Sequence, residues 1–188
     1  GWKPCIGDFG LLAPMYAHLG RDPYPASLMQ KRAPRVYRWV ERMNRADQDV
    51  PEFFTPGTEF LDSDEIPETL MAVLRAVAED FVPETRAAAE RINDWLGQQQ
   101  PEAGATAVGR LGNLVGRAEF SVRGQTITAL ASPYRFYLLQ RVQAIYAGLP
   151  LAEQASVEQM LQACGMHEML SIKLDRSIGR ADNLEVWL

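Results

Sequence analysis

Cys5 and Asp8, in the stretch PCIGD, are the first side chains whose types and spacing could do chemistry. A thiol at the N-terminus of a helix is activated as a nucleophile, because the helix dipole favours the thiolate. The same spacing also matches a capping box, Ser/Thr-x-x-Glu/Gln, in which two residues satisfy each other's backbone donors. Sulfur accepts hydrogen bonds poorly, so Asp8 should do most of the capping. We favour the structural interpretation of this pair.

A metal site is the second chemistry to consider. The nitrogen and sulfur ligands are two cysteines and two histidines, namely Cys5, His18, Cys164 and His167. A structural zinc site usually takes four such ligands with tight spacing at both ends. Cys164 and His167 have that spacing, but twelve residues separate Cys5 from His18. The sequence therefore predicts no metal site.

Other catalytic patterns are weak. The stretch GRLGNLVGR, with Gly109, Gly112 and Gly116, is neither a dinucleotide fingerprint nor a P-loop. Three acids, Asp62, Asp64 and Glu65, gather ahead of an expected helix, where they complement its dipole. No serine has the context of a nucleophile elbow. We assign no catalytic residue to this chain.

Aromatic side chains are more informative, because helical bundles build apolar ligand pockets between their helices. Eight lie on or beside expected helices: Tyr16, Tyr24, Tyr37, Trp39, Trp95, Tyr134, Phe136 and Tyr137. Most should belong to the core. A partly open aromatic cleft is the functional alternative.

Composition sets the class of protein. The chain has 188 residues, 47% of them hydrophobic, and a net charge of −5, which fits a globular domain and argues against nucleic acid as a partner. No apolar run is long enough to span a bilayer, and no secretion signal is present. Two distant cysteines do not make a disulfide scaffold, so we expect a cytoplasmic protein without a membrane partner.

The first elements that must position these residues lie within 1–47. Residues 4–19 have apolar side chains at helical spacing, interrupted at Pro14, where we expect a kink. Residues 21–25, with two prolines, predict a turn. A second helix should begin at Pro34, a good first helical position.

The remainder predicts further helices and one hairpin. Residues 66–97 read as a pair of helices, the second beginning at Pro83, and 118–131 as a hairpin turning at Arg123-Gly124. Within 132–188, a helix after Ser132-Pro133 is apolar on several faces and should be central to the core. A later helix ends before Gly165, where Met166 could pack back in a Schellman-type ending, and LEVWL is a possible strand. We predict one mainly α domain, 1–188, with a small hairpin.

The stretch from Pro4 to Asn44 resembles the C-terminal helical domain of glutathione S-transferases. In that family a Ser/Thr-x-x-Asp cap begins a buried helix, and Cys5 and Asp8 fall on the cap and acid positions. Trp39 falls where the next helix commonly carries an aromatic residue ahead of an arginine, here Arg42. The resemblance is closest over residues 3–45, and the later part resembles the long extension of certain bacterial members.

The resemblance implies a role as the acceptor-substrate side of a longer enzyme. In the family, an N-terminal thioredoxin-like domain activates the thiol of glutathione, and this chain lacks such a domain. We expect Tyr16, Tyr24 and Trp39 to line a wall that holds a hydrophobic electrophile, with glutathione as co-substrate of the longer protein and no cofactor in this chain. The chain alone should be inactive, and a homodimer is possible.

Two alternatives stay open. The chain could be a non-catalytic helical module for protein association, since it is rich in arginine and aromatic residues, which are enriched at interface hot spots. It could also be a helical pocket protein that binds a small apolar ligand on its own.

Overall fold

The computed structural model describes residues 4–45, 61–62, 65–108 and 115–188. The chain divides into two compact units, Gly1–Glu65 and Ile66–Leu188, where the sequence predicts a single domain over 1–188. The division arises because the helices of each unit find their packing partners within that unit. The fold is mainly helical with two small antiparallel sheets, which confirms the predicted class.

The first unit contains helices α1 (Ile6–Pro14), α2 (Pro23–Arg32) and α3 (Pro34–Met43), with a π-helical turn, η1 (Met15–Leu19), after α1. The predicted break at Pro14 is confirmed, since the α-helix ends there and the backbone continues with π-type bonds. Proline has no backbone donor, so the regular bonding ladder is interrupted at this point. α3 begins at Pro34, as predicted.

The predicted turn over residues 21–25 is confirmed for Arg21 and Asp22 and is wrong from Pro23 onward. Pro23 and Pro25 belong to the first turn of α2, with Asp22 as its N-cap residue. The first N–H groups of a helix have no partner inside the helix, so proline loses nothing there. Two prolines in close succession therefore start this helix and do not prevent it.

The second unit is organised around α4 (Glu68–Gln99), a single helix of 32 residues, where the sequence predicts two helices meeting at Pro83. A proline inside a helix costs about 3 kcal/mol. Its neighbours Val82 and Thr85 are buried, and Ala88, Ala89, Ile92 and Leu96 continue the same buried stripe. Packing of this stripe outweighs the local cost, so the helix continues.

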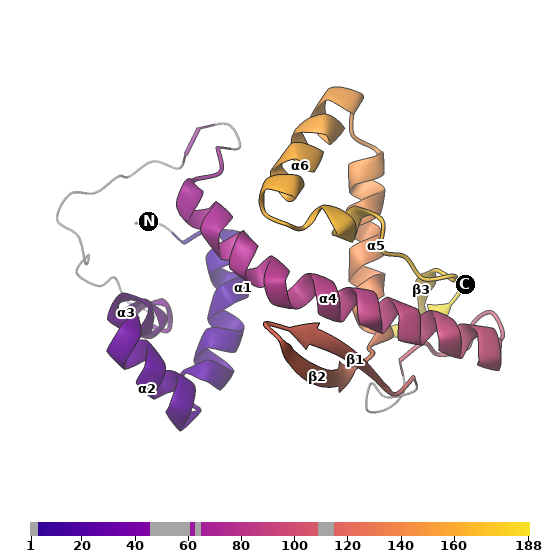
Figure 1. Ribbon diagram of the computed structural model, residues 1–188, viewed down its shortest axis with the longest axis horizontal. Helices are drawn as coiled ribbons and strands as arrows, with labels where there is room; N and C mark the ends of the chain where they lie inside the picture. The colour runs from indigo at the N-terminus through magenta and orange to yellow at the C-terminus, as the bar shows by residue number, and fades with distance from the viewer. Residues whose placement is uncertain (1–3, 46–60, 63–64, 109–114) are drawn as a thin grey trace. The chain divides into compact units, whose positions relative to one another are not determined.

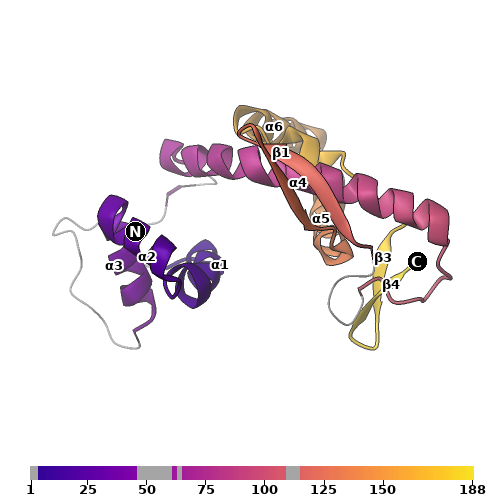
Figure 2. The ribbon, with the colours of Figure 1, turned by 60° about the horizontal axis from the view of Figure 1, so that its bottom comes forward.

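Two hairpins complete the strands. β1 (Arg117–Val122) pairs with β2 (Gln125–Leu130), and β3 (Ile178–Ala181) pairs with β4 (Leu184–Trp187). The first hairpin and the strand in LEVWL are as predicted. Figure 2 shows the first hairpin crossing in front of α4, and the side chains of Ala118 and Val122 are buried.

The remaining helices are α5 (Pro133–Ala147), α6 (Leu151–Ala163) and the short 3-10 helix η2 (His167–Leu170). The Schellman ending of α6 is confirmed: Met166 donates its N–H to the Leu161 carbonyl at 2.8 Å, and Gly165 has φ +77°. The sequence predicts α5 to be central to the core, but only one part of it is: Phe136 is buried in the core cluster, while other apolar side chains of the helix are not. Ile145 is 70% exposed, and Leu138 and Val142 are also exposed.

The core of the second unit joins α4 to the end of the chain (Figure 1). Trp187 is fully buried and its ring lies 6.0 Å from that of Trp95. Ile92 and Ile178 are buried in the same cluster. Within the described ranges, no helix combines the length and apolar character needed to cross a membrane.

Candidate functional site

The sequence-predicted site residues all lie in the first unit. Asp8 lies in the first turn of α1, and its Oδ2 accepts the backbone N–H of Cys5 at 2.7 Å. A capping box over these two residues begins the helix. The Cys5 thiol is exposed. The capping box fixes the residue at which α1 begins, so we assign a structural role to Cys5 and Asp8.

Tyr16 lies in the π-helical turn η1, a type of turn that occurs frequently at functional sites. The guanidinium of Arg21 lies 4.2 Å from the centre of its ring, in a cation–π contact. Gly20 closes the turn by donating its N–H to the Met15 carbonyl at 2.7 Å. A Cβ at Gly20 would lie 2.9 Å from the same oxygen, so the turn requires glycine.

The other two predicted aromatic residues are less enclosed. Tyr24, in the first turn of α2, is 79% exposed, while Trp39, on α3, is half-buried. No ring contact joins Tyr16, Tyr24 and Trp39 among the described residues. The structure places all three in the first unit, where Tyr24 is open to solvent and Tyr16 and Trp39 are half-buried.

Apolar side chains dominate the exposed surface of α1. None of its residues is buried, Ile6 is 92% exposed and Phe9 is 57% exposed. Leu11, on the same helix, is exposed as well, and so is Leu19 at the end of η1. The helix that the resemblance expects to be buried therefore shows its apolar side chains to solvent, where they form a surface for a ligand or for another part of a protein.

A shallow pocket of about 260 Å³ lies in the second unit, where α4 ends. It is lined by Leu96, Gly97, Gln100, Pro101, Asp175 and Arg176. Arg176 donates to the carbonyls of Pro101 and Leu188, so its guanidinium already holds two segments of the chain together. None of the predicted aromatic residues lines this pocket.

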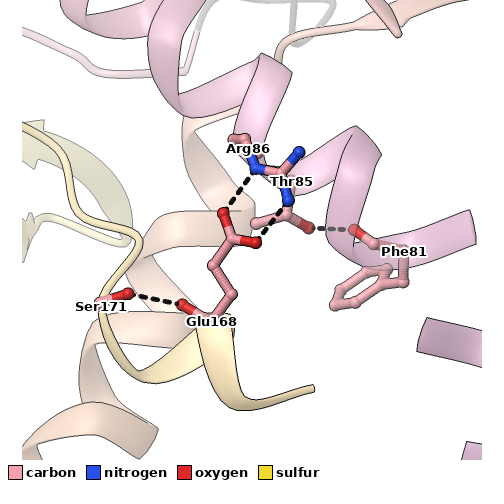
Figure 3. Close-up of polar contacts among 5 residues, drawn as sticks. All are labelled: Phe81, Thr85, Arg86, Glu168 and Ser171. Atoms are coloured by element: carbon pink, nitrogen blue, oxygen red, sulfur yellow. Dashed lines mark hydrogen bonds and ion pairs between the residues drawn. The ribbon is translucent and has the colours of Figure 1, made fainter. Parts of the chain in front are cut away.

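An ion pair joins α4 to η2 (Figure 3). Arg86 and Glu168 face each other with two parallel bonds, one of them from Arg86 Nε to Glu168 Oε1 at 2.5 Å. The hydrogen bond from Arg86 holds the pKa of Glu168 below its ordinary value. About half of the Arg86 side chain is exposed to solvent. We interpret this ion pair as a structural contact between α4 and η2 and call it the Arg86 clamp.

A second polar cluster joins α4 to α5. Arg135 donates to Glu84 Oε1 at 2.5 Å and to the Thr85 hydroxyl at 3.2 Å. Thr85 is fully buried and donates its hydroxyl to the Phe81 carbonyl at 2.7 Å (Figure 3). Sequence reasoning misses both clusters, because Arg86 and Arg135 find their partners fifty or more positions away and no local pattern links them.

No metal site is assembled in the described part of the chain, where no three His, Cys, Asp or Glu side chains gather closely. His18 and His167 are exposed. Gly109, Gly112 and Asp64 lie outside the described residues. Gly116 has φ +96°, a conformation that favours glycine.

Comparisons of the chain with protein-family models, with curated proteins and with solved structures find no match. The resemblance to glutathione S-transferases therefore rests on residues 3–45 and stays a prediction.

Proposed function

We propose that this chain is the acceptor-substrate side of a glutathione S-transferase-like protein. The observation that carries the proposal is the combination at α1: a capping box over Cys5 and Asp8 begins a helix whose apolar side chains are exposed. The cap follows the family's pattern at Asp8, whereas Cys5 replaces the usual Ser or Thr and makes the cap weaker. The exposed side chains are what a wall for a hydrophobic electrophile requires.

The contribution of this chain to the reaction is binding and orientation. Two aromatic rings offer surface to an apolar electrophile. Tyr16, in the π turn, is held by its cation–π contact with Arg21. Trp39, on α3, is half-buried. Holding the electrophile against a glutathione thiolate lowers the entropic cost of the encounter, and an apolar wall removes water from the thiolate. A thioredoxin-like domain of the longer protein would supply the activating residue, so no proton transfer falls to this chain.

The test compares the longest natural protein that contains this sequence with the chain alone. We expect the longer protein to conjugate glutathione to an activated chloronitrobenzene and the chain alone to show no turnover. Tyr16→Ala should raise KM for the electrophile roughly tenfold, because ring surface is lost from the wall, and should leave KM for glutathione unchanged. Tyr134→Ala, an exposed tyrosine of the second unit, is the matched control. Turnover by the chain alone, or equal effects of both substitutions, would contradict the proposal.

A second candidate is a non-catalytic module for protein association. The observation in its favour is the exposure of the apolar side chains of α1, where Ile6 and Phe9 are accessible to solvent. The preceding domain of the longer protein separates the two candidates. An activating Ser, Cys or Tyr there favours the transferase, and a thioredoxin-like domain without one favours association.

A further inference from the structure

The C-terminal hairpin has both of its outer edges occupied. On the β3 side, the amide of Gln140 donates to the Ile178 carbonyl, and Gln140 Oε1 accepts the Ile178 N–H at 3.1 Å. On the β4 side, Ala107 donates to the Glu185 carbonyl at 2.8 Å, and Trp187 donates to the Ala105 carbonyl at 2.9 Å. Most outward backbone groups of this hairpin therefore have partners. The exceptions among the described residues are those of Arg180 and the N–H of Glu185, and both of these residues carry a charge, which disfavours edge-to-edge pairing.

The outer edge of β2, in the first hairpin, differs from the edges of the C-terminal hairpin. The register of the first hairpin pairs Val122 with Gln125 across the two-residue turn, without a bulge. The bond from the Ala131 N–H to the Gly116 carbonyl fixes the alternation of the ladder. Alternate residues of β2 therefore direct their backbone groups away from β1, namely Thr126, Thr128 and Leu130. Among the described residues, no hydrogen bond reaches these outward groups.

The open edge of β2 has none of the usual protections. Its sequence, QTITAL, contains no charge, no proline and no glycine, and five of its six side chains are exposed. β1 carries Arg117 and Glu119 at its own outward positions. Charged side chains, prolines and bulges are the means by which proteins prevent edge-to-edge pairing. An uncharged, β-branched edge is instead a template for another strand.

We propose that the outer edge of β2 pairs antiparallel with the same edge of a second copy of this chain. With Thr128 on the two-fold axis, Thr126 lies opposite Leu130 of the second copy, and Thr128 lies opposite its own counterpart. This pairing makes about six backbone hydrogen bonds. It forms one continuous four-stranded sheet, in the order β1, β2 and then β2 and β1 of the second copy.

A second copy fits this edge for two reasons. No charged side chain meets a like charge in the register, although the protein as a whole has a net charge of −5, and a Thr–Thr pair is a favourable cross-strand contact. Pairing also covers Ile127 and Leu130, which are exposed hydrophobic residues at this edge. The pairing does not depend on the proposed transferase function.

The test measures the oligomeric state of the full chain by sedimentation velocity over a wide concentration range. We expect a concentration-dependent dimer. Thr128→Lys should weaken dimerisation about tenfold or more, because it places two like charges opposite each other on the axis. Thr128→Glu should do the same, and mixing the two variants should restore a heterodimer. Ser121→Lys, an exposed position on β1, is the matched control and should leave the dimer intact.

Amide hydrogen exchange checks the register. The amides of Thr126, Thr128 and Leu130 should gain protection as the concentration rises, while those of Gln125, Ile127 and Ala129, which face β1, should change little. A chain that stays monomeric at all concentrations overturns the proposal, even if its β2 edge binds an extended peptide. A dimer that Ser121→Lys and Thr128→Lys weaken equally, or that the mixed variants fail to restore, overturns it as well.

Discussion

The two units differ in how they hold their helices. In the second unit, α4 alone contributes eight buried side chains, and strands from both hairpins close the core around it. In the described part of the first unit, Met29 and Val40 are the buried hydrophobic residues, and α1 contributes none. The first unit relies on local devices: a capping box, prolines at helix starts and a glycine-dependent π turn. Its stability should therefore respond to backbone and cap changes, and that of the second to core packing.

Ile92→Ala should have the largest effect, since Ile92 is fully buried in the second unit. Removing such a side chain typically costs about 2–5 kcal/mol. Val40→Ala, at the best-buried position of the first unit, should cost roughly 1.5 kcal/mol. Hydrogen exchange followed peptide by peptide measures the two units separately. Equal losses of unfolding free energy from the two substitutions would contradict the proposed difference between the units.

Gly20→Ala should come next, with a loss of roughly 1–3 kcal/mol, because the new Cβ would lie 2.9 Å from the Met15 carbonyl. Gly10→Ala is the control: space around Gly10 is open within α1, so alanine should stabilise the helix by about 0.5–1 kcal/mol. Thermal unfolding followed by circular dichroism measures both. A tolerated alanine at position 20 would show that the π turn does not depend on this close approach.

Asp8→Ala should cost about 1 kcal/mol, because it removes the acceptor for the Cys5 N–H. Cys5→Ser should be neutral or slightly stabilising, since a hydroxyl is the better capping acceptor. Urea unfolding of each variant measures the difference. If Cys5→Ser abolished an activity of the longer protein while the fold survived, the thiol would be reactive and the capping interpretation would be wrong.

Glu168→Gln should have the smallest effect, a few tenths to about 1 kcal/mol near neutral pH, because the ion pair with Arg86 is partly exposed. The folded-state pKa of Glu168 lies below its ordinary value of 4.5. The pair's stabilisation is therefore present above that ordinary pKa and is lost as the pH falls through the lower folded value.

The measurement for Glu168 is the difference in unfolding free energy between wild type and variant over an acid series. It should shrink toward low pH. Glu102→Gln, an exposed carboxyl in the loop after α4, is the control and should show no such trend. A constant difference across the series would mean that the Arg86 clamp contributes nothing electrostatic.

Local signals predicted much of the fold. Pro34, Ser132-Pro133, Arg123-Gly124 and Gly165 act within a few residues of themselves, and the structure follows each of them. The hairpin of β3 and β4 has a similar local signal, because Asp182-Asn183 forms its turn with both φ angles positive. Turn, cap and helix-start signals of this kind can therefore be recognised in a single sequence.

Packing between residues that are distant in the chain could not be predicted from the sequence. Pro83 looked like a helix start, but burial of its neighbours carries α4 through it. The apolar faces of α5 looked like core, but Ile145 is exposed because α5 packs on its neighbours through one side. The same limit applies to the site: the Cys5–Asp8 pair is local, whereas Arg86 and Glu168 are 82 positions apart.

One contact of the second unit bears on the order of events during synthesis. Asn93, on α4, donates its amide to the Lys173 carbonyl at 3.2 Å and accepts the Asp175 N–H at 2.9 Å. These partners leave the ribosome long after α4, whereas the helices α2 and α3 of the first unit pack on each other within a short stretch of chain. The first unit can therefore fold while translation continues, but the part of α4 that packs on the C-terminal segment, at Trp95 and Trp187, stays uncovered until that segment is made. A chaperone that binds nascent apolar helices should engage the growing chain in that interval.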